Sequence, residues 1–403
     1  MWGMALRLPP VCKVNFMQIK KIEAFPLRYP EPNDHNNLRH IMLVRVETDD
    51  GLVGWGEAIT MWPEASRATK IIVEDGMRPV LLGRDPRDTY ALWLAMKEQC
   101  WWYGHGGIAS FAVSALDIAM WDLKGKALGV PLHQLFGGKL TPRLRACIST
   151  HPSKSSITDM ADELAAYARQ GFTAIKCGFG KKGEANLGYD SARDIAFVKA
   201  VRAATGPGVD FMVDYGHPVR MEVNQAIRVA HAYEEVGIRW LEDPLRTWDW
   251  EGYAHLRAAV QTQICTGEDL WTVNDYHRLI KSGCVDIVMV DPGRAEGITG
   301  YWKVQEMTAH ENRYINAHAW SSAIITGITM GKKRTGSTNS LALVFTARAE
   351  NSVPQATKPT VESNVITSIS PENTFRLKRK AKIGRAMTST TNRKTRQLSI
   401  LPA

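Results

Sequence analysis

Three carboxylates stand at the ends of apolar stretches in the middle of the sequence. Asp214 follows the apolar run Phe211–Val213, Glu242 ends "IRWLE", and Glu268 ends "ICTGE". A buried strand has no structural need for a carboxylate at its end. Placed together, three carboxylates would repel one another and raise their pKa values, and a divalent cation removes that repulsion. Because carboxylate oxygens suit Mg²⁺, we expect Asp214, Glu242 and Glu268 to hold this ion.

A candidate acid–base pair follows the next two apolar stretches. Asp291 ends "DIVMVD", and His318 lies in "INAHA". A carboxylate that accepts a hydrogen bond from one imidazole nitrogen orients the other nitrogen and raises the histidine pKa. We therefore expect His318 to be the main acid or base, oriented by Asp291.

Two further side chains are candidates for catalysis. Lys176, in "AIKCG", can donate to a substrate carboxylate or act as an acid on the other face, and an ion pair with the metal-ligating acids is the alternative. His217, three residues after Asp214, can protonate a leaving hydroxyl, or it can be a histidine at the rim of the site.

The elements that position these residues alternate between strands and helices. Amphipathic helical segments separate apolar runs at "LRACIST", "FTAIKCG", "VDFMVDYG", "IRWLEDP", "QICTGED", "VDIVMVD" and "RYINAHA", with an eighth run at "SLALVFTA". This alternation predicts βα units around a parallel sheet. Eight units favour a (β/α)8 barrel of the TIM type, in which active sites lie at the C-terminal ends of the strands. Neither a dinucleotide-binding glycine motif nor a P-loop is present.

The preceding region has a different pattern. Two strand-like runs and an Asp-Asp-Gly turn predict a hairpin before several helices. We divide the chain into an N-terminal extension (1–16), an α+β capping domain (17–142), a catalytic barrel domain (143–350) and a basic, poorly ordered tail (351–403).

Composition excludes several classes of protein. The net charge of +9 belongs to residues 329–403, which carry 14 basic and three acidic side chains, whereas the rest of the chain is close to neutral. Binding to nucleic acid is therefore not expected of the body of the protein. No apolar run is long enough to span a membrane, and the first residues do not resemble a signal peptide, so we expect a cytoplasmic protein. The six cysteines are widely spaced, which indicates buried thiols.

The constellation resembles the enolase superfamily, and within it the mandelate racemase subgroup. "VDYG", "WLEDP" and "TGED" are similar to the three metal-ligating strand ends of that group, and Asp291 and His318 are similar to its acid–base dyad. "ALDIAMWDLKGKALGVPLHQLFGG" resembles the last helix of its capping domain. The resemblance covers about Met17 to Ile325. It implies Mg²⁺, removal of the proton α to a carboxylate, and a metal-stabilised enediolate.

Two departures from the family pattern bear on the reaction. Racemases of this group carry Lys-x-Lys on the second barrel strand, whereas here the second position is Gly178. Chemistry on one face favours elimination of water over proton transfer between faces. The second departure is at Thr346, where the eighth strand is expected to end in an acid, and the residues beyond it no longer resemble the family.

These observations favour a Mg²⁺-dependent dehydratase, a hydro-lyase, acting on a small sugar acid such as an aldonate or aldarate. We also expect a homo-oligomer. A racemase, epimerase or cycloisomerase that uses the same enolate is the alternative. A catalytically impaired member whose basic tail binds a polyanion is a third reading.

Overall fold

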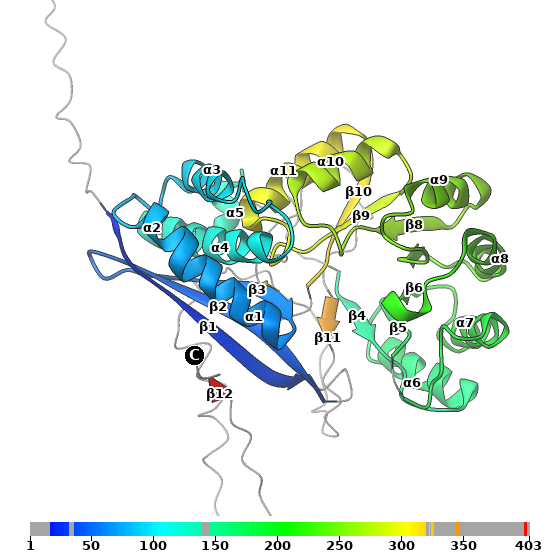
Figure 1. Cartoon of the computed structure of the whole chain (residues 1–403). Helices are drawn as coiled ribbons and strands as arrows, with labels where there is room; N and C mark the ends of the chain where they lie inside the picture. The colour runs from blue at the N-terminus through cyan, green and yellow to red at the C-terminus, as the bar shows by residue number, and fades with distance from the viewer. Residues whose placement is uncertain are drawn as a thin grey trace, which may run out of the picture.

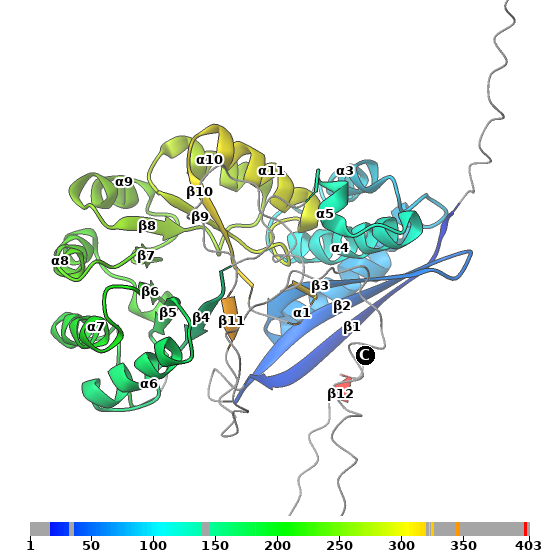
Figure 2. The same cartoon turned by 180° about the vertical axis from the view of Figure 1, so that it is seen from behind.

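The computed structural model describes residues 17–31, 36–138, 145–181, 183–319, 322, 324–325, 344–346 and 399–400. These residues form an N-terminal antiparallel sheet covered by helices and a C-terminal parallel sheet surrounded by helices (Figures 1 and 2). The first part is drawn in blue to cyan and the second in green to yellow (Figure 1). The α/β architecture, with a capping part and a barrel-like part, agrees with the prediction.

The capping sheet contains three long antiparallel strands, β1 (Ile19–Glu31), β2 (Asn37–Thr48) and β3 (Val53–Met61). The predicted hairpin joins β2 to β3. Gly51 has a φ of 86°, a left-handed conformation that a glycine adopts without strain. The Thr48 amide donates to the Leu52 carbonyl at 2.9 Å, which closes the turn.

Helices cover one face of this sheet. They are α1 (Pro63–Ile71), the π-helical segment η2 (Ile72–Met77), α2 (Arg78–Leu81), α3 (Thr89–Gln99), α4 (Ile108–Leu128) and α5 (Leu132–Leu135). The long helix α4 lies directly on β3, because a side chain at Gly54 or Gly56 would overlap the backbone oxygens of Ala119 and Ala115. These two glycines allow close packing, and α4 contains the first part of the segment that resembles the last helix of the family's capping domain.

The second part alternates strands and helices as predicted. Its strands are β4 (Cys147–Thr150), β5 (Ala174–Phe179), β6 (Asp210–Tyr215), β7 (Trp240–Glu242), β8 (Gln263–Thr266), β9 (Ile287–Val290), β10 (Tyr314–Ala317) and β11 (Val344–Thr346). Its helices are α6 (Ile157–Arg169), α7 (Ser191–Thr205), η3 (His217–Val219), α8 (Val223–Glu234), α9 (Trp250–Ala259), α10 (Val273–Ser282) and α11 (Gly297–His310).

The strands form one parallel sheet in the order β10-β9-β8-β7-β6-β5-β4-β11. The predicted eighth strand exists as β11 and pairs with β4, so that Val344 lies opposite Cys147. Among the described residues no ladder joins β10 to β11. The sheet is therefore a curved, open version of the expected barrel, with α6 to α11 on its outer side (Figures 1 and 2).

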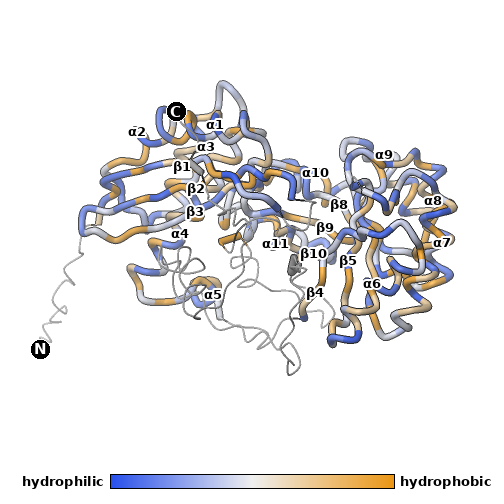
Figure 3. The backbone as a smooth tube through the Cα atoms, turned by 90° about the horizontal axis from the view of Figure 1, so that it is seen from below, coloured by the Kyte–Doolittle hydropathy of each residue, from blue (hydrophilic) through white to orange (hydrophobic). Residues whose placement is uncertain are grey.

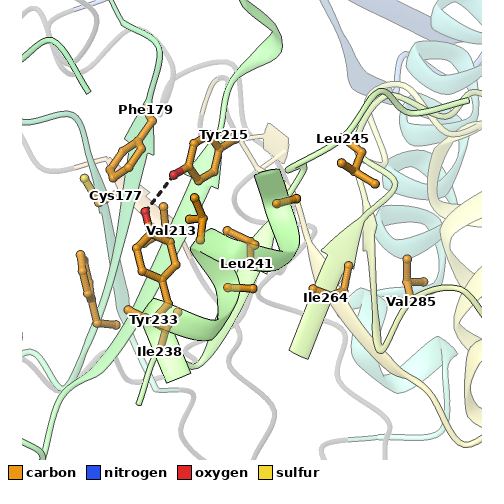
Figure 4. Close-up of a cluster of buried hydrophobic side chains, with 14 of the residues drawn as sticks. Cys177, Phe179, Val213, Tyr215, Tyr233, Ile238, Leu241, Leu245, Ile264 and Val285 are labelled. Carbon is orange, nitrogen blue, oxygen red and sulfur yellow. Dashed lines mark hydrogen bonds between the residues drawn. The ribbon is translucent and has the colours of Figure 1, made fainter. Parts of the chain in front are cut away.

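The main core lies between the parallel sheet and its outer helices. Hydrophobic residues follow the strands, whereas the outer helices carry both hydrophobic and hydrophilic residues (Figure 3). Two buried tyrosines of this core share a hydrogen bond, with 2.8 Å between the hydroxyls of Tyr215 and Tyr233 (Figure 4). The Tyr215 hydroxyl also lies 3.3 Å from Oδ2 of the buried Asp194. The Gly188 amide donates to Oδ1 of the same carboxyl group at 2.8 Å.

Helices α4 and α11 hold the two parts together. Asp117 of α4 accepts hydrogen bonds from the Thr299 amide at 2.9 Å and from its hydroxyl at 2.6 Å. Trp121 Nε1 donates to the Thr299 hydroxyl at 2.9 Å. At the C-terminal end of β9, the Ile59 amide of β3 donates to the Gly293 carbonyl at 3.3 Å. This bond places the capping sheet beside the loop after β9.

Several predictions fall partly outside the described residues. Only Ser399–Ile400 of the expected tail is described, and these two residues pair with β1 as the short strand β12, so at least they do contact the cap. The rest of the tail, the N-terminal extension and Cys12 lie outside the described residues. The other five cysteines are buried free thiols, as expected. In the part of the chain that the structure describes, no helix has the length and apolar character needed to cross a membrane.

Candidate active site

The structure brings the three predicted metal ligands together at one edge of the parallel sheet. Asp214 is directly opposite Glu242 in the β6–β7 register, and Glu268 follows β8 by two residues. One carboxylate oxygen of each residue lies within 4.8 Å of the others. Parallel strands carry their C-terminal ends to the same edge, which is why residues spaced 26 to 28 positions apart converge here.

Lys176 lies beneath two of these carboxylates. Its Nζ atom is 2.8 Å from Asp214 Oδ2 and 2.6 Å from Glu242 Oε1. Burial lowers the pKa of the Lys176 ammonium, but the charges of Asp214, Glu242 and Glu268 outweigh it and hold the pKa above its usual range. The structure therefore shows the ion-pair alternative for Lys176, and its contact with substrate stays a prediction.

Glu242 is the most deeply buried member of the cluster. The other oxygen of its carboxyl group, Oε2, accepts a hydrogen bond from Trp240 Nε1 at 2.9 Å. Burial and the charge of Asp214 raise the pKa of Glu242 to about 7, although Lys176 opposes the change. A carboxyl group held in this way gains from any additional positive charge placed beside it.

The carboxylate cluster fits a divalent cation. Glu268 Oε2 is buried and accepts no hydrogen bond among the described residues, although it lies at ion-pair distance, 3.3 Å, from His318 Nε2. The one ammonium of Lys176 does not neutralise three carboxylates. An all-oxygen donor set with an excess of negative charge is the chemistry that Mg²⁺ requires, so Asp214, Glu242 and Glu268 are the residues that would hold it.

The predicted dyad is also assembled. His318 Nδ1 lies 2.6 Å from Asp291 Oδ2, and the fully buried Asp291 is fixed by the Gly293 amide, which donates to its Oδ1 at 2.7 Å. Nδ1 therefore carries the hydrogen, and Nε2 is the nitrogen that can exchange a proton with a substrate. His318 Nε2 lies 3.3 Å from Glu268 Oε2, so the dyad borders the carboxylate cluster directly.

The surroundings of His318 favour its charged form. Burial lowers the pKa of the imidazole, but the charge of Glu268 and the contact with Asp291 raise it to about 9 overall. A cation held by the three carboxylates would reduce the contribution of Glu268. Without a cation the ring therefore holds its proton near neutral pH, and a cation on the carboxylates would shift it toward the neutral form that can accept one.

The structure does not bring His217 into this group. It begins the short segment η3 after β6, and its side chain is exposed. Among the described residues no hydrogen bond or ion pair joins it to the three carboxylates. Its assignment as a proton donor stays a prediction.

A different histidine, His151, lies beside Gly178, the residue that stands where racemases of the group carry a second lysine. His151 follows the last residue of β4, and its Nδ1 lies 3.2 Å from the carbonyl oxygen of Gly178. A Cβ atom on residue 178 would lie 2.5 Å from Nδ1 of this ring. The expectation that Gly178 leaves this face without a basic side chain is therefore wrong, because a neighbouring strand supplies an imidazole. The signal in the sequence was a histidine directly after the first barrel strand, in "ISTHP".

A second acidic cluster lies beside the first, shares Glu268 with it, and is paired with a guanidinium group. Asp243, Glu268 and Asp269 form it, and Arg220 Nη2 lies 3.0 Å from Asp243 Oδ2 and 2.7 Å from Asp269 Oδ2. Burial and the charge of Glu268 raise the pKa of Asp243, and Arg220 opposes the change. We interpret this cluster as an ion-pair network that supports the loop after β7.

The capping sheet contributes to the rim of the site. Glu57 of β3 is fully buried and accepts hydrogen bonds from the backbone amide of Ser322, at 3.1 Å, and from its hydroxyl. Ser322 follows His318 by four residues. The segment that follows His318 is therefore tied to the capping sheet. Thr346 is described only in its backbone, so the expectation about its side chain lies outside the described structure.

Comparison with known proteins agrees with this geometry. Residues 35–137 match the N-terminal domain of mandelate racemase and muconate lactonizing enzyme, and residues 159–344 match the enolase C-terminal domain-like family. The chain belongs to the enolase superfamily, in the mandelate racemase subgroup.

Characterised relatives divide between two reactions. A D-galactarolactone cycloisomerase from Agrobacterium fabrum is 30% identical over 286 residues, which are 70% of this chain and 72% of that protein. A D-galactonate dehydratase from Verminephrobacter eiseniae is 32% identical over 276 residues, or 67% and 69% of the two chains. A mandelate racemase/muconate lactonizing protein from Paracoccus denitrificans, crystallised with magnesium, is 27% identical with a TM-score of 0.72, and the match covers 83% of this chain and 88% of that one.

Proposed function

We propose that this protein is a Mg²⁺-dependent hydro-lyase that removes water from a small sugar acid, an aldonate or an aldarate. The observation that carries the proposal is the contact between the carboxylate cluster and the Asp291–His318 dyad, with 3.3 Å between Glu268 Oε2 and His318 Nε2. A cluster that holds a cation would bind the substrate carboxylate, and the adjacent imidazole would then lie beside the α-carbon.

The chain's own residues have distinct roles in this proposal. His318 Nε2 removes the α-proton, and Asp291 keeps the ring in the correct tautomer and stabilises the imidazolium that forms. Lys176 provides the permanent positive charge at the base of the site. The cation supplies, when bound, further positive charge to offset the negative charge that develops on the substrate carboxylate.

Elimination is favoured by the named dehydratases among the relatives, which include a D-gluconate dehydratase from Thermoproteus tenax and an arabinonate dehydratase from Saccharolobus solfataricus. The product would be a 2-keto-3-deoxy acid, which forms when the enol produced by loss of water becomes a ketone. Incubation of the full chain and Mg²⁺ with a panel of aldonic and aldaric acids tests the proposal through the semicarbazide reaction of this product. Absence of such a product from every acid would contradict it.

A racemase or cycloisomerase is the second candidate. The observation that favours it is the imidazole of His151 over Gly178, because two proton-transfer groups on opposite sides of a substrate permit proton removal on one face and return on the other. The same panel run in D₂O separates the candidates. An epimer or isomer with deuterium on the α-carbon would identify this second reaction.

A further inference from the structure

The imidazole of His151 occupies the inner layer of the sheet that residue 178 would otherwise fill. Side chains two positions apart on a strand point to the same side. Lys176 of β5 points toward the carboxylates, since its Nζ contacts Asp214 and Glu242. Residue 178 therefore faces the same way, one layer nearer to the strand ends. Gly178 has no side chain there, and the ring of His151 takes its place.

This layer is level with the carboxylate cluster. Gly178 is opposite Asp214 in the β5–β6 register, and Asp214 is opposite Glu242 in the β6–β7 register. The Nε2 atom of His151 lies only 3.5 Å from the point where a Cβ of residue 178 would stand. The ring thus lies over β5, the strand next to the one that carries Asp214.

The two histidines approach the carboxylates from opposite ends. In the sheet order, β6 and β7 carry Asp214 and Glu242, and Glu268 follows the neighbouring strand β8. His151 comes from β4 and leans over β5, beside the Asp214 end, whereas His318 follows β10 and contacts the Glu268 end. A substrate whose carboxylate lies on the cluster would therefore have one imidazole on each side.

The contact with Gly178 selects the nitrogen that exchanges a proton. A backbone carbonyl only accepts hydrogen bonds, so Nδ1 of His151 must carry a hydrogen to bond to it. This condition is met by the neutral Nδ1–H tautomer and by the imidazolium, and it excludes the neutral Nε2–H tautomer. In both permitted forms, Nε2 is the atom that gains or loses the proton.

We propose that His151 is the second acid–base residue of this site, and that it donates the proton on Nε2 to the hydroxyl group that leaves the substrate. This proposal rests on the proposed dehydration. His318 takes the proton from the α-carbon, the electrons of that C–H bond form the new double bond, and the β-carbon–oxygen bond breaks. The oxygen leaves as water with the proton from His151. The proton gained by His318 and the one lost by His151 then exchange with solvent.

Changing the leaving group tests this role directly. His151→Gln keeps a polar side chain but cannot donate as an acid, so we expect turnover of the hydroxy acid to fall about 10²–10⁴-fold. Fluoride leaves without a proton. The same variant should therefore release fluoride from the 3-deoxy-3-fluoro analogue within about tenfold of the wild-type rate, a far smaller loss than that of a missing acid. In D₂O it should still exchange the α-proton of the hydroxy acid, because His318 is intact.

A double-mutant cycle provides a second measurement. Gly178→Ala places a methyl group where the ring of His151 lies, so the ring must move although its chemistry is unchanged. This variant should reproduce the loss selective for the hydroxy acid. In a His151→Ala background the same glycine change should cost little more, because the ring is already absent. His255→Gln, on the exposed face of α9, is the matched control for loss of an imidazole.

The placement of the ring is tested without turnover by ¹⁵N NMR of the histidines in the metal-free protein. We expect His151 to show a hydrogen on Nδ1, and Gly178→Ala to shift its signals. A neutral Nε2–H tautomer would overturn the proposal. It is also overturned if His151→Gln slows the hydroxy and fluoro substrates equally, or if the selective loss arises in His217→Gln instead. If wild-type protein and Mg²⁺ convert no sugar acid at all, the proposed function fails, and the NMR result alone decides whether His151 has the required placement.

Discussion

Replacing Glu242 by glutamine separates the structural role of this buried carboxylate from its proposed role as a metal ligand. The change removes one negative charge and keeps the shape of the side chain. Trp240 Nε1 can still donate to the amide oxygen of the glutamine, so the hydrogen bond of 2.9 Å has a replacement acceptor. What changes is the balance of charge among Lys176, Asp214 and Glu268.

In the metal-free protein, Glu242→Gln removes two opposing interactions of similar size. These are the repulsion by Asp214 and Glu268 and the attraction to Lys176. The carboxylate oxygens lie within 4.8 Å of one another, and at that distance and an effective dielectric constant of about 20 each pair repels by about 3.5 kcal/mol. Glu242 takes part in two such pairs, so its neutralisation relieves at least about 7 kcal/mol. The attraction to Lys176, at 2.6 Å, is about 6 kcal/mol on the same scale. The raised pKa of Glu242, about 7, agrees with a carboxylate whose charge is not strongly favoured.

We therefore expect Glu242→Gln to change the free energy of unfolding in EDTA by no more than about 1 kcal/mol, a typical effect of one substitution. The same substitution should, however, strongly reduce the stabilisation that Mg²⁺ provides. At a concentration of about 100 times its Kd, an ion that binds only the folded state stabilises it by about 2.7 kcal/mol. A hundredfold loss of affinity would reduce that gain to about 0.4 kcal/mol.

Urea unfolding followed by tryptophan fluorescence, with EDTA and with MgCl₂, measures both quantities. Glu251→Gln, on the exposed side of α9, is the control and should keep the full response to Mg²⁺. The reasoning fails if Glu242→Gln keeps the response of the wild type. It also fails if the variant loses more than about 3 kcal/mol in EDTA, the range expected when a buried ion pair is broken.

Three further predictions follow from the geometry. His318→Asn should lower kcat about 10²–10⁴-fold and leave the Mg²⁺-dependent stabilisation in place, because in the proposed mechanism the histidine transfers protons and does not ligate the ion; loss of both in the same unfolding and kinetic assays would show a structural role. A competent sugar acid should give a 2-keto-3-deoxy acid by NMR, and a product that is only an epimer would contradict dehydration. Burial raises the pKa of Asp194 to about 6, so its stabilising contribution is complete below the unfolded value near 4 and is lost as the pH rises through 6. Asp194→Asn should therefore gain about 1–3 kcal/mol relative to wild type between pH 4 and pH 8 in urea unfolding, with Asp162→Asn, at an exposed position of α6, as the comparison; a difference for Asp194→Asn that stays flat would refute the assignment.

The parts of the site that could be predicted are those in which one strand carries its own functional side chain. Asp214, Glu242 and Asp291 each follow a short apolar run, and a parallel sheet brings the C-terminal ends of such runs to one edge. The type and order of residues are enough for this inference. The curvature of the sheet and the length of β11 depend on packing far from the site, and the apolar pattern alone does not determine them.

Lys176 shows what the sequence leaves open even at a correctly predicted position. Its place on β5 was predictable, but its partner was not, because an inward-facing ammonium can contact either the substrate or the neighbouring carboxylates. The structure resolves this for the protein without substrate, with distances of 2.8 Å to Asp214 and 2.6 Å to Glu242. The choice depends on the depth of the side chain in the sheet, which follows from the register of β5 with β6 and β7 and is not visible in a single strand.

His151 could not be assigned for a related reason. Gly178 has no side chain. The sequence of β5 alone therefore predicts that nothing fills the inner face of the sheet at this residue. Close packing does not tolerate such a vacancy, and a neighbouring side chain fills it. His151 stands at the end of β4, the strand beside β5, and the carbonyl group of Gly178 fixes its ring at 3.2 Å. A glycine on the inner face of a barrel strand therefore directs attention to the residues that follow the two adjacent strands, because one of them can supply the missing functional group.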